Sequence, residues 1–293
     1  MNAVAQQKLE KLFSFFLTRN QEQERDRLAF ENGDAQVIKN PFHELCDPEL
    51  FYAGSQHARI FESLRQCCLA GLSLGSVTGE VGSGKSMLCQ MLRCHLDPGR
   101  ITQSYVLGLS RMSPAAFLKA VLHGVGYRIQ IVEKRYAASD LFHLLGEYCR
   151  QLQASEQRLV ILIDEAHLLS AEALKVVKSI SCLENPQDKL ASCLLFGEPN
   201  LNERLEHEVF ASLKSRFYVR EHIDPLSMEE TRAYITHRLH AAGYPSNTLM
   251  ESELQMIAEE SCGNCRDINK LAYERFRLRY APHQPFINRD GLE

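Results

Sequence analysis

The sequence predicts an α/β protein built on a mostly parallel sheet, with a small helical domain after it. Short apolar segments alternate with amphipathic helical segments over residues 55–223, which is typical of parallel strands joined by crossover helices. Residues 159–163 are apolar throughout, as expected for a strand that is buried on both faces. Only helical patterns follow residue 224. We therefore expect an α/β domain at 40–223 and a helical lid domain at 224–293.

Composition indicates an ordinary globular protein. Of the 293 residues, 45% are apolar and 24% are charged, and the net charge of −4 excludes a globally basic nucleic-acid-binding protein. The first residues lack the apolar core of a signal peptide, and no apolar stretch is long enough for an integral membrane segment. The ten cysteines are scattered, so we expect free thiols in a reducing cytoplasm. Cys262 and Cys265 form a lone C-x-x-C pair, for which a metal or redox role is the less favoured interpretation.

The first 39 residues predict an N-terminal helical extension, because apolar side chains recur there at helical spacing: Leu9, Leu12, Phe13, Phe16 and Leu17. Two interpretations are equally favoured. The apolar face packs on its own domain, or it makes an oligomer or partner contact.

Within the α/β domain, the pattern predicts strands at 72–78, 101–109, 159–163, 190–196 and 217–223. Helices are expected at 55–69, from 87 onward, and at 114–123, 139–153 and 171–181. In the lid domain, Ser227 and Glu230 form a capping box, and helices are expected at 229–242, 252–261 and 267–280.

The strand at 72–78 leads directly into a G-x-x-x-x-G-K-S loop, the pattern that binds nucleotide phosphates. The glycines let the backbone N–H groups point inward at anionic oxygens, and the following helix adds its N-terminal partial charge. Lys85 supplies a positive charge for the β- and γ-phosphates, and the Ser86 hydroxyl is a ligand for Mg²⁺. The expected ATP-binding residues are Gly79, Glu80, Val81, Gly82, Ser83, Gly84, Lys85, Ser86 and Met87.

A second acidic motif completes this pattern. The apolar strand at 159–163 is followed by Asp164 and Glu165. We expect Asp164 to hold Mg²⁺ and Glu165 to be the general base that activates water. Either motif alone also fits a glycine-rich turn or a strand with an acidic end, but together they favour a Mg–ATP site. The string from Asp164 to His167 also matches the box of one helicase class, which we discount because those helicases need a second nucleotide-binding core.

Arginines are the remaining expected members of the site, because phosphoryl transfer needs extra positive charge. Arg216 precedes the last strand, and Arg266 begins the third helix of the lid domain. Each is either an ordinary surface arginine or part of the site. In the second interpretation Arg216 reaches the γ-phosphate of a neighbouring subunit, and Arg266 reports the nucleotide state from the lid.

The chain resembles the AAA+ ATPases of the general secretion pathway protein A (ExeA-like) group, which has pilus-biogenesis and transposition-associated relatives. The resemblance covers about residues 40–280. It rests on the two motifs above and on further segments at 40–42, 47–52, 197–201, 225–227, 234–243 and 263–269.

This resemblance implies a P-loop fold with a three-layer core and an ATP-driven switch that forms rings or filaments. It gives Arg216 the position of a trans-acting arginine finger and Arg266 that of the second sensor. The first sensor falls at Glu198, where relatives usually carry Gln. A carboxylate there repels a γ-phosphate unless a cation intervenes, so this departure puts the sensing role of Glu198 in doubt.

Three functions follow from these observations. The leading one is an ATPase whose nucleotide-dependent homo-oligomers organise a secretion or pilus assembly, in the cytoplasm or at the inner membrane through a partner. The alternative is a transposition-type regulator that forms filaments on duplex DNA and recruits a recombinase. Its basis is a basic helix at 266–279, for which a solvated face is the favoured interpretation. The third is an ATP-binding scaffold with negligible turnover, against which Glu165 argues.

Overall fold

The computed structural model describes residues 40–127 and 136–280 of the chain. The N-terminal helix expected within residues 1–39 lies outside the described residues. The described chain divides into two compact units. One spans Ser55–Asp224 and is called the α/β unit, and the other joins residues 40–54 to residues 225–280 and is called the helical unit.

The α/β unit is built on one five-stranded parallel sheet with the strand order β2-β3-β4-β1-β5. The inner strands β1, β3 and β4 are almost entirely buried. Of the edge strands, β2 has buried, half-buried and exposed positions, and β5 alternates between half-buried and exposed positions up to its buried last residue. Every strand overlaps the segment predicted for it, with ends displaced by at most two residues. The strands are β1 (Leu74–Gly79), β2 (Ile101–Leu107), β3 (Arg158–Asp164), β4 (Ala191–Gly197) and β5 (Phe217–Ile223).

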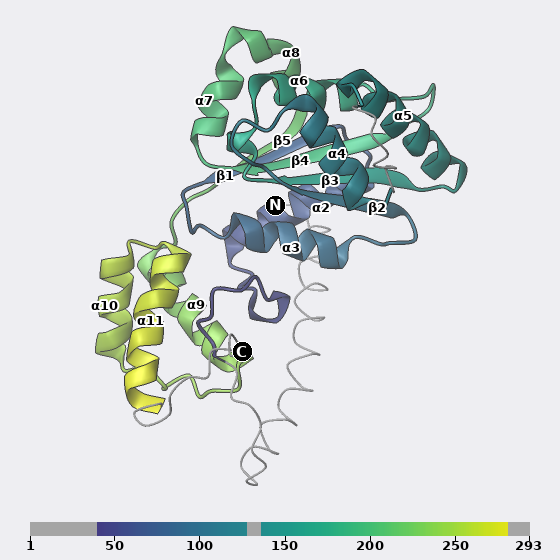
Figure 1. Cartoon of the computed structure of the whole chain (residues 1–293). Helices are drawn as coiled ribbons and strands as arrows, with labels where there is room; N and C mark the ends of the chain where they lie inside the picture. The colour runs from purple at the N-terminus through teal and green to yellow at the C-terminus, as the bar shows by residue number, and fades with distance from the viewer. Residues whose placement is uncertain (1–39, 128–135, 281–293) are drawn as a thin grey trace, which may run out of the picture. The chain divides into compact units, whose positions relative to one another are not determined.

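Helices cover both faces of this sheet, which gives the three-layer architecture that the sequence predicts (Figure 1). One face carries α2 (Ser55–Leu69) and α3 (Lys85–His95), and the other carries α4 (Pro114–Gly124), α5 (Ala138–Ala154) and α6 (Ala171–Ile180). Buried apolar side chains fill the layer between the second group and the sheet. At the start of α4, the Ser113 hydroxyl accepts the backbone N–H of Ala116 at 3.3 Å, with Pro114 at the first helical position.

Four short elements between β3 and β5 were not predicted, because each is too short to show a helical period. They are η2 (Ala166–Leu168), α7 (Asn200–Glu206), η3 (Glu208–Phe210) and α8 (Ala211–Lys214). Two of them position site residues. The turn η2 follows Asp164 and Glu165, and α7 begins two residues after Glu198.

The helical unit contains three helices, α9 (Met228–Ala241), α10 (Glu251–Ser261) and α11 (Cys265–Tyr280), as expected. The capping box at the start of α9 is confirmed, since Ser227 Oγ accepts the Glu230 N–H and the Glu230 carboxylate accepts the Ser227 N–H. Gly263 lies between α10 and α11 with φ +77°, and a Cβ there would collide with the backbone of Leu226. Glycine is therefore required at that turn.

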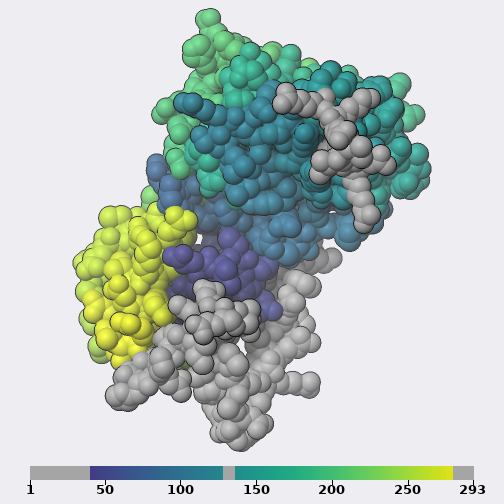
Figure 2. All heavy atoms as spheres, in the orientation of Figure 1, coloured from purple at the N-terminus to yellow at the C-terminus, as the bar shows by residue number. Residues whose placement is uncertain are grey.

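Residues 40–54 belong to the helical unit, which differs from the division expected from the sequence. They include η1 (Pro48–Leu50) and lie against α9 and α11, where Figure 2 shows the purple segment beside the yellow helix. The Phe42 and Phe276 rings meet edge to face at 6.0 Å. The buried Arg238 donates from Nε to the Pro41 carbonyl at 2.6 Å and from Nη2 to the His43 carbonyl at 3.1 Å. These contacts join segments nearly two hundred residues apart, so no local pattern could predict them.

The structure contains no helix, within residues 40–127 and 136–280, that is long and apolar enough to cross a bilayer.

Candidate nucleotide-binding site

The glycine-rich loop lies between the carboxyl end of β1 and the start of α3. Gly82 and Gly84 have φ angles of 84° and 97°, which L side chains rarely adopt. A Cβ on Gly79 would approach Ser83 Oγ to 2.6 Å. The loop therefore favours glycine at positions 82 and 84, where its backbone curls tightly before the helix, and a side chain at position 79 would displace the Ser83 hydroxyl.

Lys85 is held inside the loop and is only 6% exposed. Its Nζ donates hydrogen bonds to the carbonyl oxygens of Gly79 at 2.8 Å and Glu80 at 2.7 Å. Burial lowers the pKa of Lys85, because desolvation disfavours the charged form. Neighbouring carboxylates oppose that shift by favouring the ammonium ion: Glu165, Asp164, Glu198 and Glu80.

Ser86 and Asp164, the two expected Mg²⁺ ligands, are brought together by α3 and β3. Ser86 Oγ donates to Asp164 Oδ2 at 2.8 Å, and the Tyr105 hydroxyl donates to the same oxygen at 3.4 Å. Burial, together with the Asp164 charge, raises the pKa of Tyr105, so this phenol stays protonated and is a hydrogen-bond donor. Asp164 itself is 3% exposed. The two oxygen donors thus share one partly buried position beside the loop.

Glu165 directly follows β3 in the left-handed region, with φ 52° and ψ 37°. Few non-glycine residues adopt this conformation, and it directs the chain into the turn η2. The Glu165 N–H donates to Asp164 Oδ1 at 3.0 Å. The side chain of Glu165 is 36% exposed, so its carboxylate is accessible to water.

Glu198 and Glu165 both face His167, whose side chain is only 8% exposed. His167 Nδ1 lies 3.4 Å from Glu165 Oε2, and its Nε2 lies 3.5 Å from Glu198 Oε1. The backbone N–H of Glu198 also donates to Nδ1 at 3.4 Å. Glu165 and Glu198 thus contact opposite nitrogens of one imidazole, and the sensor role of Glu198 stays a prediction.

The residues present fit a magnesium nucleotide. Ser83 Oγ, in the middle of the loop, is buried and has no hydrogen-bonding partner among the residues that the structure describes. The loop thus combines three groups that bind anionic phosphates: this hydroxyl, the buried Lys85 and the amino end of the eleven-residue helix α3. Ser86 and Asp164 offer Mg²⁺ the oxygen donors that it prefers.

Arg216 lies at the opposite end of the sheet from the loop. It immediately precedes β5, whose first residue Phe217 pairs with Leu74, while Gly79 pairs with Ile223. The loop follows the carboxyl end of β1, whereas Arg216 precedes the amino end of β5. Six residue steps of parallel strand correspond to roughly 20 Å, so Arg216 does not reach the loop of its own chain.

Arg266 is in the first turn of α11, on the helical unit, and its side chain is exposed. Its backbone N–H donates to Asn264 Oδ1 at 3.0 Å, an Asx turn that starts the helix. Its sensor role stays a prediction.

Two residues near the loop were not assigned from the sequence. His167 was noted only as part of the acidic string, although it contacts both carboxylates. Asn202, in α7, donates from Nδ2 to Thr78 Oγ1 at 2.8 Å. It ties α7 to the end of β1, just before the loop. No sequence motif indicates that Asn202 lies near the loop. For His167 a signal was present, because it follows Asp164 and Glu165 closely in the sequence.

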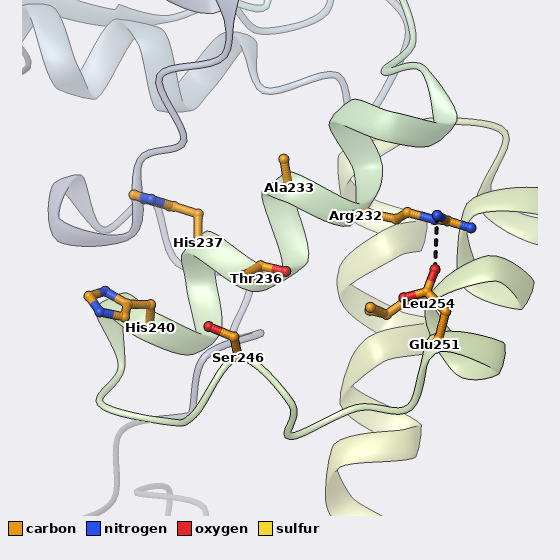
Figure 3. A pocket seen from close by; sticks show the side chains of 8 residues that line it. All are labelled: Arg232, Ala233, Thr236, His237, His240, Ser246, Glu251 and Leu254. Carbon is orange, nitrogen blue, oxygen red and sulfur yellow. Dashed lines mark ion pairs between the residues drawn. The ribbon is translucent and has the colours of Figure 1, made fainter.

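A separate pocket of about 490 Å³ lies in the helical unit, between α9 and the segment that leads into α10 (Figure 3). Its lining includes Arg232, His237 and His240. Arg232 forms an ion pair with Glu251 at 2.8 Å, so its charge is already neutralised. Burial lowers the pKa of His237 to about 4, and this ring is therefore neutral near pH 7.

Cys265, the second cysteine of the C-x-x-C pair, is half-buried, and desolvation raises the pKa of its thiol to about 11. A thiol that stays protonated is a poor nucleophile and a poor metal ligand.

Comparison with known proteins agrees with this fold. A family model described as an AAA domain matches residues 70–205. General secretion pathway protein A of Aeromonas hydrophila is 28% identical over 232 residues, which cover 79% of this chain and 41% of that protein. The chain thus spans about two fifths of the length of this curated relative.

Solved structures with the same fold are much more distant in sequence. The ORC1 protein of Aeropyrum pernix, solved in complex with DNA, gives a TM-score of 0.63 at 18% identity, over 83% of this chain and 64% of that one. The ORC2 protein of the same organism, solved in ADPNP–ADP complexes, gives 0.62 at 14% identity, over 84% and 73%. At such identities the likeness shows the fold. The chain therefore has the α/β P-loop fold, matches the model of an AAA domain over residues 70–205, and is similar over most of its length to general secretion pathway protein A.

Proposed function

We propose that this protein binds and hydrolyses Mg–ATP at sites shared between subunits, and that ATP-dependent homo-oligomerisation organises a protein partner. The observation that carries the proposal is the 2.8 Å hydrogen bond from Ser86 Oγ to Asp164 Oδ2, beside the buried Lys85. It supports a magnesium site next to the phosphate loop, because both oxygens lie where one cation could bind them.

Each side chain has a distinct role in this proposal. Loop N–H groups and Lys85 bind the phosphates and offset their charge. Bound Mg²⁺ supplies further positive charge at the phosphates. Glu165 accepts a proton from the attacking water, and its partial exposure gives water access to the carboxylate. The water oxygen attacks the γ-phosphorus, and ADP leaves.

The location of Arg216 supports a site shared between subunits. The roughly 20 Å of strand between it and its own loop leave the cis site without an arginine finger. A neighbouring copy that presents the Arg216 end of its sheet to this loop would supply that charge through a head-to-tail interface. Such interfaces close into rings or continue as filaments, and Arg266 would contribute from the helical unit.

The likeness to general secretion pathway protein A favours a partner in a secretion or pilus assembly, with the protein in the cytoplasm or held peripherally at the inner membrane. The DNA alternative receives less support from the side chains of α11. Arg279 pairs with Glu253 at 3.3 Å, and Lys270 pairs with Asp267 at 3.6 Å, so both cations are already engaged within the helical unit. We therefore favour the protein partner.

The test of hydrolysis is the Glu165→Gln variant, which keeps the shape of the side chain and removes the base. We expect steady-state ATP hydrolysis to fall by about 10²-fold or more, with ATP binding retained and oligomers lengthened. Glu172→Gln, on the exposed first turn of α6, is the matched control and should behave as wild type. Unchanged hydrolysis in Glu165→Gln would refute the assignment, and absent hydrolysis in wild type with tight ATP binding would favour the scaffold.

A further inference from the structure

Glu165, His167 and Glu198 form a cluster of side chains that can each bind a metal ion, and the proposed ATP site uses Glu165 of this cluster as its general base. One ligand atom from each of the three side chains can be chosen so that all lie within 4.8 Å of one another. Glu165 and His167 follow β3 and Glu198 follows β4, and these strands are parallel neighbours. The carboxyl ends of adjacent parallel strands therefore bring the three groups together.

The imidazole of this cluster is held in place by its surroundings. The His167 side chain is 8% exposed, and the Glu198 N–H contacts its Nδ1 at 3.4 Å. Arg204, in α7, donates to the carbonyl oxygens of His167 and Leu169, which fixes the turn that carries the ring. A metal site needs this kind of support, because a held ligand loses little freedom when the ion binds.

The cluster lies in a region of excess negative charge. Glu165 and Glu198 both act electrostatically on Lys85, and so do Asp164 and Glu80. Four carboxylates thus share the positive charge of one lysine, and the excess negative charge favours a cation.

We propose that Glu165, His167 and Glu198 bind a divalent transition metal of the zinc class in the nucleotide-free protein. One nitrogen and two oxygen donors suit Zn²⁺, Co²⁺ or Mn²⁺ better than Mg²⁺, which prefers oxygen ligands alone. Bonds of about 2.0–2.2 Å to the metal place the donors of a tetrahedral site about 3.4 Å apart. The carboxylates, 36% and 32% exposed, can close the remaining gap by rotating toward the buried ring.

The site has a consequence that rests on the proposed function. A metal bound to the Glu165 carboxylate withdraws its lone pairs, so this group can no longer accept a proton from water. The phosphate loop contributes none of the three ligands. Zinc-class ions should therefore inhibit hydrolysis while ATP binding persists.

Cobalt titration of the full chain, free of nucleotide and Mg²⁺, tests the site directly, because Co²⁺ absorbs visible light in a ligand-dependent way. We expect one Co²⁺ per chain, displaced by Zn²⁺, and affinity lowered by at least about tenfold in both His167→Ala and Glu198→Gln. The control is His143→Ala, which removes an exposed His–Glu pair with a 3.2 Å contact on α5 and should leave binding unchanged. Thermal melting checks the fold of each variant, and Glu198→Gln carries the test where His167→Ala unfolds.

A wild-type protein that binds no Co²⁺, or binds it equally in the two site variants, overturns the inference. The same holds if His167→Ala slows hydrolysis but no metal binds, since the histidine then acts only as a hydrogen-bonding partner. A protein that binds Co²⁺ through these residues yet hydrolyses no ATP refutes the proposed function and supports the metal site.

Discussion

Mixing two inactive variants would test whether Arg216 acts across a subunit boundary. Arg216→Ala lacks the finger but retains Glu165, whereas Glu165→Gln lacks the general base but retains the finger. Loss of an arginine finger lowers the rate of phosphoryl transfer by about 10³-fold or more, so each variant alone should be nearly inactive. ATP binding should be retained in both, because neither change touches the phosphate loop.

The activity regained on mixing the two variants can be calculated if each site is shared between neighbouring subunits. Arg216 precedes Phe217, which pairs with Leu74 at the far end of β1, so roughly 20 Å of strand separates it from its own loop. A working site must then take Glu165 from one subunit and Arg216 from its neighbour. In a random equimolar mixture, half of the subunits carry each intact residue, so about one quarter of the interfaces regain both.

The assay is phosphate release at fixed total protein, measured across mixing ratios from one pure variant to the other. We expect a maximum near equal amounts, at about one quarter of the wild-type rate. The control mixes Arg216→Ala with wild type. Its rate of phosphate release should fall steadily as the share of the variant rises, without a maximum. Full activity of Arg216→Ala alone, or no rescue in mixtures shown to form mixed oligomers, would refute the reasoning.

Three further predictions follow from the same contacts. Asp164→Asn keeps the hydrogen bond to Ser86 but loses the charge, so hydrolysis should fall by about 10²-fold and its Mg²⁺ optimum should rise, as a magnesium titration of the rate would show. Gly263→Ala forces a side chain onto the Leu226 backbone at φ +77° and should lower the free energy of unfolding by at least about 1–3 kcal/mol, measured in urea. His237 has a folded pKa of about 4 because burial disfavours its charged form, so the unfolded chain takes up its proton first as pH falls below 6.5. Its stability contribution is therefore complete above pH 6.5 and falls by about 2 kcal/mol by pH 5, and His237→Gln should lose that dependence in urea unfolding at the two pH values.

The predictable part of this protein was the part encoded over short stretches of chain. The loop from Gly79 to Ser86 and the apolar strand before Asp164 can each be recognised from their own residues. A parallel sheet then places Ser86 close to Asp164. All five strands were predicted in the same way, since each is a short segment between two helical patterns. The catalytic and sensor roles of Glu165, Arg216 and Arg266 remain predictions.

What could not be predicted depends on contacts between distant segments. Nothing near Phe42 indicates that its ring packs on Phe276, so residues 40–54 were expected with the sheet instead of the helices. Glu198 was a suspected departure from its relatives, but only the fold shows that His167 lies between it and Glu165. The position of Arg216 required the register of β5 against β1.

The placement of residues 40–54 also affects the order in which the protein can fold during synthesis. This segment leaves the ribosome before the α/β unit, yet its partners Arg238 and Phe276 are made after that unit is complete. The α/β unit, Ser55–Asp224, is continuous in the chain and can fold as soon as it emerges. The helical unit can be completed only last, because residues 40–54 must pair with residues 225–280, which are synthesised after the whole α/β unit.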